Sequence, residues 1–318
     1  MSYITVNNLQ KHYTVYEKTN RLRRNKRTIK ALDDINFTVE EGAFLGYIGP
    51  NGAGKSTTIK VLTGIMTPDD GEAKVGDYIP YKHRKAYVRN IGVVFGQKTQ
   101  MWWDLPVIDT YRLLSGIHRL SPQAFKRQLE YLCDRLDLEE ILYQPVRQLS
   151  LGQRMRAEMG ACMIHDPKIL FLDEPTIGLD VISKQKVNHF LKELNQSGKT
   201  IFLTTHDLKD IESLCQEMLI LSHGKIVYKG AIDRLKSSTE LPILVTAQLP
   251  LEQPLDALHH LRDRYAFSFD QERSQLEIQL TEKKQVAELA RTLFHQYEIE
   301  DFRVDEPSIE EIIKKIYA

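Results

Sequence analysis

One glycine-rich segment of the sequence could hold a phosphate group. Residues 49–56 read G-P-N-G-A-G-K-S and fit the pattern G-x-x-x-x-G-K-[ST] between an apolar run and a helical pattern. Glycines let backbone N–H groups turn inward around an anion, and the following helix adds partial positive charge at its N-terminus. In such a loop Lys55 reaches the β- and γ-phosphates and Ser56 binds Mg²⁺. The predicted nucleotide-binding residues here are Gly49, Asn51, Gly52, Ala53, Gly54, Lys55, Ser56 and Thr57.

Two adjacent carboxylates follow a second apolar run, Ile169 to Leu172. In open α/β sheets ligands bind beyond the carboxyl ends of the strands, where Asp173 and Glu174 would lie. Asp173 is suited to bind Mg²⁺ through a water, and Glu174 to orient or deprotonate an attacking water. Two acids at a solvated strand end are the alternative, but the phosphate loop upstream favours the functional interpretation.

A five-residue segment between these motifs carries a family resemblance. Leu149-Ser150-Leu151-Gly152-Gln153 resembles the signature of the nucleotide-binding subunits of ABC transporters, with Leu151 where the family usually has glycine. The resemblance implies that Ser150, Leu151, Gly152 and Gln153 contact the ATP held by a second chain. The leucine puts in question how closely this loop approaches the γ-phosphate.

Four further residues match elements of the same family. Gln97 resembles the glutamine that touches Mg²⁺ and the attacking water, and Asp180 lies in a segment resembling the D-loop. His206 follows an apolar strand and resembles the switch histidine that contacts the γ-phosphate. Tyr13 resembles the aromatic residue that stacks on adenine, with Tyr3 and Tyr16 as neighbouring alternatives. The resemblance thus implies Glu174, His206 and Gln97 as catalytic residues and Ser56, Gln97 and Asp173 as the metal site.

The resemblance also implies how the chain works. Each ATP, with Mg²⁺, would lie between the phosphate loop of one chain and the signature of a second ATP-binding subunit, so a head-to-tail homodimer is expected. The stretch from Val93 to Pro106 is similar to a bacterial branch that serves ABC-2-type exporters, including viologen or drug exporters. We therefore expect an ATP-hydrolysing subunit that powers integral membrane permease subunits of ABC-2 type. It would be peripheral, on the cytoplasmic face of a bacterial cell membrane.

A cluster of apolar residues follows Gln97. Trp102, Trp103, Leu105 and Pro106 lie in a predicted loop, and in the family this stretch is near the groove that receives a cytoplasmic helix of the membrane subunit. Adjacent tryptophans suit an interface. Local packing beneath the helical region is the alternative.

The elements that must position these residues alternate between strands and helices. This pattern predicts an α/β fold with a mainly parallel sheet, and the resemblance specifies a P-loop NTPase ABC cassette with antiparallel β and helical subdomains. We place the cassette at 1–235, with the helical subdomain at about 97–165. From residue 236 to 318 the pattern strand, helix, strand, strand, helix, strand and final helix predicts a small C-terminal α+β domain, an accessory or dimerisation domain.

Composition excludes several classes of protein. The 318 residues carry 43 Lys and Arg against 43 Asp and Glu, so no overall basic field points to nucleic acid. The three cysteines are far apart, without a metal-ligand spacing or a disulfide pattern, and no apolar run is long enough to span a bilayer. Membrane contact is therefore expected through a partner.

Positive charge gathers in residues 17–30, which we predict to be an extended basic loop because they lack a helical apolar face. It has three interpretations: a solvated surface loop, contact of residues 21–30 with anionic lipid or the membrane subunit, and nucleic-acid binding.

Two other functions compete for the whole chain: a soluble ABC-type ATPase that regulates a ribosome or DNA partner, and a non-catalytic regulatory binder. The single cassette and the absence of long heptads disfavour the first. Retention of Lys55, Asp173, Glu174 and His206 disfavours the second.

Overall fold

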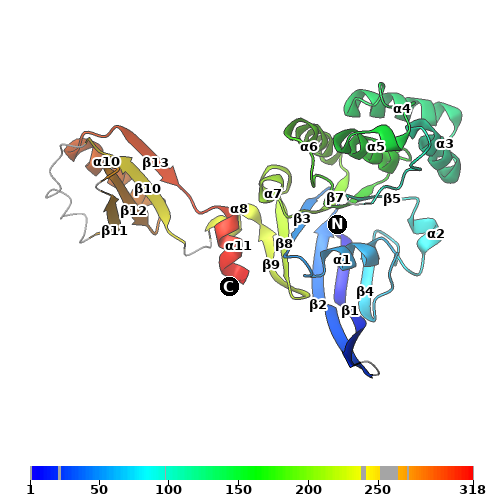
Figure 1. The fold of residues 1–318 in the computed structure, drawn as a ribbon, viewed down its shortest axis with the longest axis horizontal. Coiled ribbons are helices and arrows are strands. Elements are labelled where there is room, and N and C mark those ends of the chain that lie inside the picture. The colour runs from blue at the N-terminus through cyan, green and yellow to red at the C-terminus, as the bar shows by residue number, and fades with distance from the viewer. Residues whose placement is uncertain are drawn as a thin grey trace. The chain divides into compact units, whose positions relative to one another are not determined.

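The computed structural model describes residues 2–20, 23–96, 98–237, 241–250, 264–270 and 272–317, with the side chains of 16–26 excepted. The chain forms two compact units, Met1–Ile232 and Asp233–Ala318. Figure 1 shows the strands and helices of each. None of the helices in the described ranges is both long and apolar enough to serve as a bilayer span.

A six-stranded sheet is the centre of the first unit. Its order is β5-β6-β7-β3-β8-β9, and all neighbouring pairs are parallel except β8 with β9. Every position of β3 and β7 is buried, and both strands are mainly apolar, as expected for central strands covered on both faces. The strands are β3 Phe44–Ile48, β5 Ile91–Phe95, β6 Ile169–Asp173, β7 Thr200–Thr204, β8 Glu217–Ser222 and β9 Lys225–Ala231.

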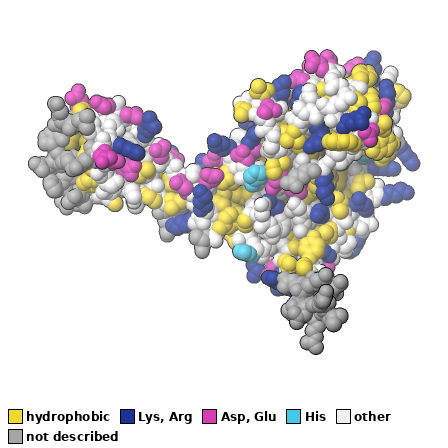
Figure 2. Space-filling view, viewed as in Figure 1, with side chains coloured by type: hydrophobic (Ala, Val, Ile, Leu, Met, Phe, Trp, Pro, Cys, Tyr) yellow, Lys and Arg dark blue, Asp and Glu magenta, His cyan; other side chains and the backbone are white. Residues whose placement is uncertain are grey.

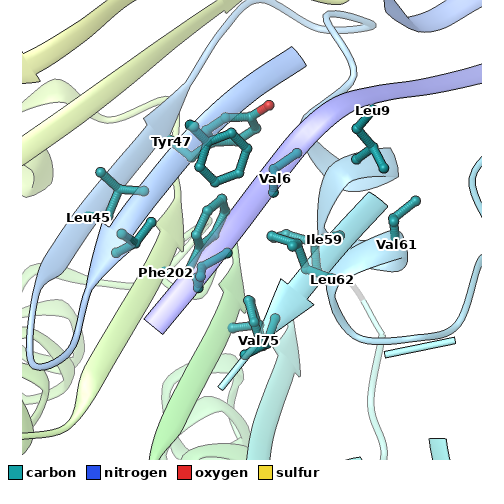
Figure 3. Close-up of a cluster of buried hydrophobic side chains, with 14 of the residues drawn as sticks. Val6, Leu9, Leu45, Tyr47, Ile59, Val61, Leu62, Val75 and Phe202 are labelled. Carbon is teal, nitrogen blue, oxygen red and sulfur yellow. The ribbon is translucent and has the colours of Figure 1, made fainter. Parts of the chain in front are cut away.

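A second, antiparallel sheet packs against the first. Its order is β2-β1-β4, formed by β1 Ser2–Asn20, β2 Arg23–Glu40 and β4 Asp70–Val75. Figure 3 shows the core between this sheet, the central sheet and α1 (Lys55–Leu62), with Tyr47 and Phe202 beside Val6 and Leu62 opposite Val75. The ring centroids of Tyr47 and Phe202 are 5.1 Å apart. This core anchors both ends of the predicted phosphate loop.

The prediction of a basic loop at 17–30 is wrong. The backbones of β1 and β2 stay paired beyond the core, with Thr14 opposite Thr28 and Lys18 opposite Arg24, so residues 17–20 and 23–30 belong to an antiparallel ladder. Lack of an apolar face argues against a helix, but a two-stranded ladder needs only backbone N–H and C=O groups. β-branched residues on both strands, such as Val15 and Ile29, favour that ladder.

Helices cover the central sheet and build a separate layer beside it. Pro122 at the first helical position and Ser121 as N-cap begin α4, with the Ser121 hydroxyl accepting from Ala124 N at 3.2 Å. The helices of this unit after α1 are α2 Arg84–Tyr87, α3 Val107–His118, α4 Pro122–Leu136, the 3₁₀ turn Val146–Gln148, α5 Leu151–Met163, α6 Val181–Gln196 and α7 Leu208–Leu214.

The second unit is a four-stranded antiparallel sheet with helices. Its order is β11-β12-β10-β13, and Val245, Ile278 and Leu289 are buried in its core. The predicted α+β pattern is confirmed for the described residues, while its first predicted helix falls on residues outside them. The elements are α8 Ile232–Ser237, β10 Ile243–Gln248, β11 Ala266–Asp270, β12 Gln275–Leu280, α10 Lys284–Gln296, β13 Asp301–Asp305 and α11 Ile309–Tyr317.

Candidate functional site

The glycine-rich loop connects the end of β3 with the start of α1. A Cβ atom at Gly49 would lie 2.4 Å from the Leu221 carbonyl oxygen, and one at Gly54, whose φ is +114°, would lie 2.4 Å from the Ala31 carbonyl oxygen. Gly52 differs, because its φ is +81° but a Cβ would meet open space. Packing therefore fixes both ends of the loop, and its middle is accessible to a ligand.

Lys55 lies across this loop. Its side chain is largely buried, and Nζ donates to the carbonyl oxygens of Gly49 at 2.6 Å and Pro50 at 3.3 Å. Burial lowers the pKa of Lys55, although the nearby carboxylates of Glu174 and Asp173 partly oppose that shift. The loop, the ammonium group and both acids thus share one site.

The other predicted loop residues surround the start of α1. Asn51 and Ser56 are exposed, whereas Ala53 is buried and its backbone N–H donates to the Pro50 carbonyl at 3.1 Å. Tyr13 of β1 comes close to Thr57, with 3.4 Å between the two hydroxyl oxygens. An aromatic ring is therefore available beside the first turn of α1, at one side of the phosphate loop.

The two acids are held by β7. Asp173 ends β6, and Thr204 on the neighbouring strand donates its hydroxyl to Asp173 Oδ1 at 2.6 Å. The Glu174 backbone N–H donates to the Thr204 carbonyl at 2.9 Å, and Glu174 has a φ of +54°. A non-glycine residue in this conformation is uncommon and marks a backbone held by its surroundings. Sequence reasoning missed Thr204; its place at the end of the next predicted strand was the available signal.

His206 lies next to Glu174. Its Nδ1 atom is 3.6 Å from Glu174 Oε2, and its side chain is the more exposed of the two. The imidazole can thus contact both the carboxylate and a ligand on the solvent side. Gln97 lies outside the described residues, although its neighbour Gly96 donates to the Asp173 carbonyl at 2.8 Å.

The signature segment begins α5. Ser150 is the N-cap, and it exchanges two hydrogen bonds with Gln153: Ser150 Oγ accepts from the Gln153 backbone N–H at 3.2 Å, and Gln153 Oε1 accepts from the Ser150 N–H at 2.9 Å. Leu151 is 37% exposed. Gly152 is buried, and a Cβ there would lie 2.1 Å from Ser183 Oγ, so α6 leaves no room for a side chain. The exposed α5 N-terminus can meet an anion from another molecule.

Asp180 caps α6 beside the signature. It accepts from the Ser183 backbone N–H at 2.9 Å and from Ser183 Oγ at 2.6 Å. These hydrogen bonds lower the pKa of Asp180. A Cβ at Gly178 would lie 3.1 Å from Leu151 Cδ2, so the two segments are in contact. The structure therefore brings the predicted residues together in two groups. The first contains the phosphate loop, Tyr13, Asp173, Glu174 and His206, and the second contains the signature and Asp180.

The two tryptophans are on the surface of the helical region. Trp102 and Trp103 are 51% and 48% exposed, and the Arg154 guanidinium lies 5.7 Å from the Trp103 ring centroid. Figure 2 shows hydrophobic side chains interspersed with charged ones over α3–α5. Trp103 thus has a local partner on α5, and about half of each side chain remains available for contact.

The oxygen atoms of Ser56 and Asp173 suit a hard cation that is also bound by phosphate oxygens. Ser56 and Asp173 provide hydroxyl and carboxylate oxygens, which Mg²⁺ prefers. Within the described ranges no cluster of three or more His, Cys, Asp or Glu side chains could enclose a metal by itself. Mg²⁺ commonly binds through one or two carboxylates together with substrate phosphate oxygens, and Ser56 and Asp173 could hold it in that way.

Comparisons with known proteins agree on one family. Residues 32–177 match the family model described as ABC transporter. The ABC transporter ATP-binding protein NatA of Bacillus subtilis is 28% identical over 225 residues, which are 71% of this chain and 92% of NatA. An uncharacterized ABC transporter ATP-binding protein of Methanocaldococcus jannaschii is 33% identical over 64% of this chain and 73% of its own length. The Nod factor export ATP-binding protein I of Ralstonia nicotianae is 33% identical over 71% of this chain and 74% of its own length.

Solved structures resemble about three quarters of the chain. An ATP-binding subunit of an ABC transporter has a TM-score of 0.64 and 26% identity, over 74% of this chain and 92% of that subunit. A dimeric post-hydrolysis state of an ATP-binding cassette bound to ADP and Pi has a TM-score of 0.61 and 26% identity, over 72% of this chain and 98% of the cassette. The predicted ABC cassette fold is confirmed.

Proposed function

The chain belongs to the ABC transporter family as an ATP-binding, ATP-hydrolysing protein, and on that premise we propose that it powers an exporter with permease subunits of ABC-2 type. The observation that carries the proposal is the convergence of Lys55, Asp173, Glu174 and His206 at one edge of the central sheet. A relative named for Nod factor export supports the direction of transport. The permease type comes from the sequence resemblance at Val93 to Pro106.

The chain's own residues have separate roles toward ATP in this proposal. The backbone of residues 49–54 and the Lys55 ammonium bind the phosphates, and the Tyr13 ring stacks on the base. Ser56 and Asp173 hold Mg²⁺, Asp173 through a water, together with Gln97. The ion, when bound, neutralises charge on the phosphate oxygens. Glu174 orients the attacking water and takes its proton as the water oxygen bonds to the γ-phosphorus and the bond from that phosphorus to the β-phosphate oxygen breaks, which releases ADP. His206 donates a hydrogen bond to the γ-phosphate, and the proton ends on a carboxylate whose backbone is anchored by β7.

A second copy completes the site in our proposal. The signature residues Ser150, Leu151, Gly152 and Gln153 form the N-terminus of α5, where Ser150 and Leu151 are exposed and a nucleotide held by another chain can meet the positive end of the helix. The related cassette described as a dimer with ADP and Pi supports this arrangement. ATP favours the closed pair because its γ-phosphate contacts both chains, and hydrolysis removes that contact.

The tryptophan segment is the proposed contact with the permease. Trp102 and Trp103 are large, half exposed and near the signature helix, as expected for a surface that couples nucleotide state to a membrane partner. Through this contact the protein is peripheral on the cytoplasmic face of the membrane. No nucleic acid is expected, because the chain as a whole is electrically balanced.

The test is co-purification in detergent of tagged Glu174→Gln protein from its native cells. We expect one or two polytopic membrane proteins, and their loss when Trp102→Glu and Trp103→Glu are added. Tyr143→Glu is the matched control, because Tyr143 is 70% exposed in the same helical region but outside the tryptophan segment. Recovery of ribosomes or DNA from fully solubilised cells would instead support a soluble ABC ATPase.

A further inference from the structure

A buried carboxylate connects three segments that each carry a candidate functional residue. Asp210 on α7 is 2% exposed. Its Oδ2 accepts from Thr176 Oγ1 at 2.7 Å, and its Oδ1 accepts from Asn188 Nδ2 at 2.8 Å. Thr176 is two residues after Glu174, and Asn188 lies on α6, the helix that Asp180 caps. Asp210 is on the helix that begins just after His206.

Lys184 adds a second connection between α6 and α7. Its Nζ is 3.0 Å from Asp210 Oδ1 and also contacts Asp207 Oδ2. Asp207 directly follows His206 and caps α7, accepting from the Lys209 backbone N–H at 3.0 Å. Burial lowers the pKa of Lys184, but its hydrogen bonds to the two carboxylates outweigh burial and raise it overall. The lysine is therefore cationic at neutral pH and bridges both acids.

The segment that carries His206 depends on these contacts. The helix α7 has seven residues, too few to be stable without tertiary contacts. The apolar anchors of α7 are Ile211 and Leu214, on the turns beyond its N-terminus. At that N-terminus, beside His206, the contacts are polar: Asp207 with Lys184, and Asp210 with Thr176, Asn188 and Lys184.

We propose that Lys184 and Asp210 are positioning residues that hold His206 beside Glu174. The proposal rests on the proposed function, because it concerns the same hydrolytic site. Removing Lys184 leaves Asp210 its Thr176 and Asn188 donors, so the fold survives, but Asp207 beside His206 loses its ion pair to α6. His206 then takes several positions, of which the one 3.6 Å from Glu174 is only one. A smaller fraction of the molecules therefore has the geometry that hydrolysis requires.

The test compares Lys184→Met with Lys184→Arg and with Lys199→Met in the full chain. Lys199 is a matched control because it is similarly shielded, 16% against 23% exposed, and its Nζ bonds Asp166 Oδ1 at 2.6 Å. It lies just before β7, at the opposite end of that strand from His206. It therefore reports what losing a shielded lysine and its ion pair costs away from the site.

We expect Lys184→Met to lower kcat by about tenfold with KM for ATP within about twofold of the wild type. Lys184→Arg should recover most of the rate, and Lys199→Met should leave kcat within about twofold of the wild type. Backbone amide exchange of residues 206–212, measured without nucleotide, should accelerate about tenfold in Lys184→Met alone.

Equal kcat and equal exchange in Lys184→Met and Lys199→Met would overturn the inference while leaving the proposed function intact. A wild-type chain that binds ATP without hydrolysing it would overturn the proposed function. In that event faster exchange confined to Lys184→Met would still support the anchoring of the His206 segment, and unchanged exchange would refute it.

Discussion

The Nδ1 atom of His206 lies 3.6 Å from Oε2 of Glu174, and the two residues follow neighbouring parallel strands. Glu174 is 19% exposed and His206 is 58% exposed. The carboxylate is therefore anchored in the edge of the sheet, whereas the imidazole faces solvent, where substrate arrives.

Replacing Lys55 should weaken nucleotide binding itself. Its ammonium provides charge-assisted hydrogen bonds to phosphates, so Lys55→Ala should lower ATP affinity by about 10–100-fold, measured by calorimetry. Lys60→Ala, further along the same helix and outside the loop, is the control. Unchanged ATP affinity in Lys55→Ala would contradict the phosphate-loop interpretation.

Thr204 should matter for turnover more than for binding. Thr204→Val keeps the shape of the side chain but removes its 2.6 Å hydrogen bond to Asp173. A bond to a charged group contributes about 1.5–3 kcal/mol, so kcat should fall by about 10-fold or more. Thr200→Val is the control at the opposite end of the same strand, where Thr200 Oγ1 accepts from the Gly42 N–H at 2.9 Å. Equal kcat in both variants would argue against a role for Thr204.

Parts of the site were predictable because they are local in sequence. The loop at Gly49 to Ser56 and the pair Asp173-Glu174 each follow one apolar run, so the pattern also indicates the strand that positions them. The Thr204–Asp173 and Thr176–Asp210 hydrogen bonds join segments about thirty residues apart, and no local sequence pattern predicts them. The loop prediction at 17–30 was wrong for another reason. High charge and missing apolar periodicity exclude a buried element, but they do not exclude a ladder of backbone hydrogen bonds.

Gly152 should resist even the smallest side chain. Its Cβ would lie 2.1 Å from Ser183 Oγ and 2.7 Å from Ser183 Cβ, so α5 and α6 must separate to accept it. Gly152→Ala should lower the free energy of unfolding by about 1–3 kcal/mol in denaturant titrations. Gly116→Ala on α3, where a Cβ meets open space, should instead be neutral or stabilising by up to about 1 kcal/mol. A neutral Gly152→Ala would show that this contact can relax.

Stability should fall in mild acid because of a stacked histidine pair. The rings of His118 and His165 are 3.7 Å apart, and burial lowers the pKa of His165 to about 4. The unfolded state, with a pKa near 6.5, binds protons first, so the free energy of unfolding drops as pH falls from about 6.5 to 4, on the order of 2 kcal/mol.

His165→Gln should flatten that pH dependence. The glutamine amide can replace the contact between His165 Nε2 and the Ile91 carbonyl oxygen, 3.0 Å apart, without titrating. Thermal melts of both proteins at pH 7, 6 and 5 provide the comparison. The same loss of Tm in both would assign the acid sensitivity to other groups.

The most direct test of Glu174 as the general base is phosphate release by Glu174→Gln at saturating ATP, with ATP binding measured on the same sample. The variant keeps the shape of the side chain but cannot accept a proton from water. We expect retained binding and hydrolysis slower than wild type by roughly 10²–10⁴-fold, the usual contribution of a general base. Hydrolysis at the wild-type rate would remove Glu174 from the reaction and contradict the central claim.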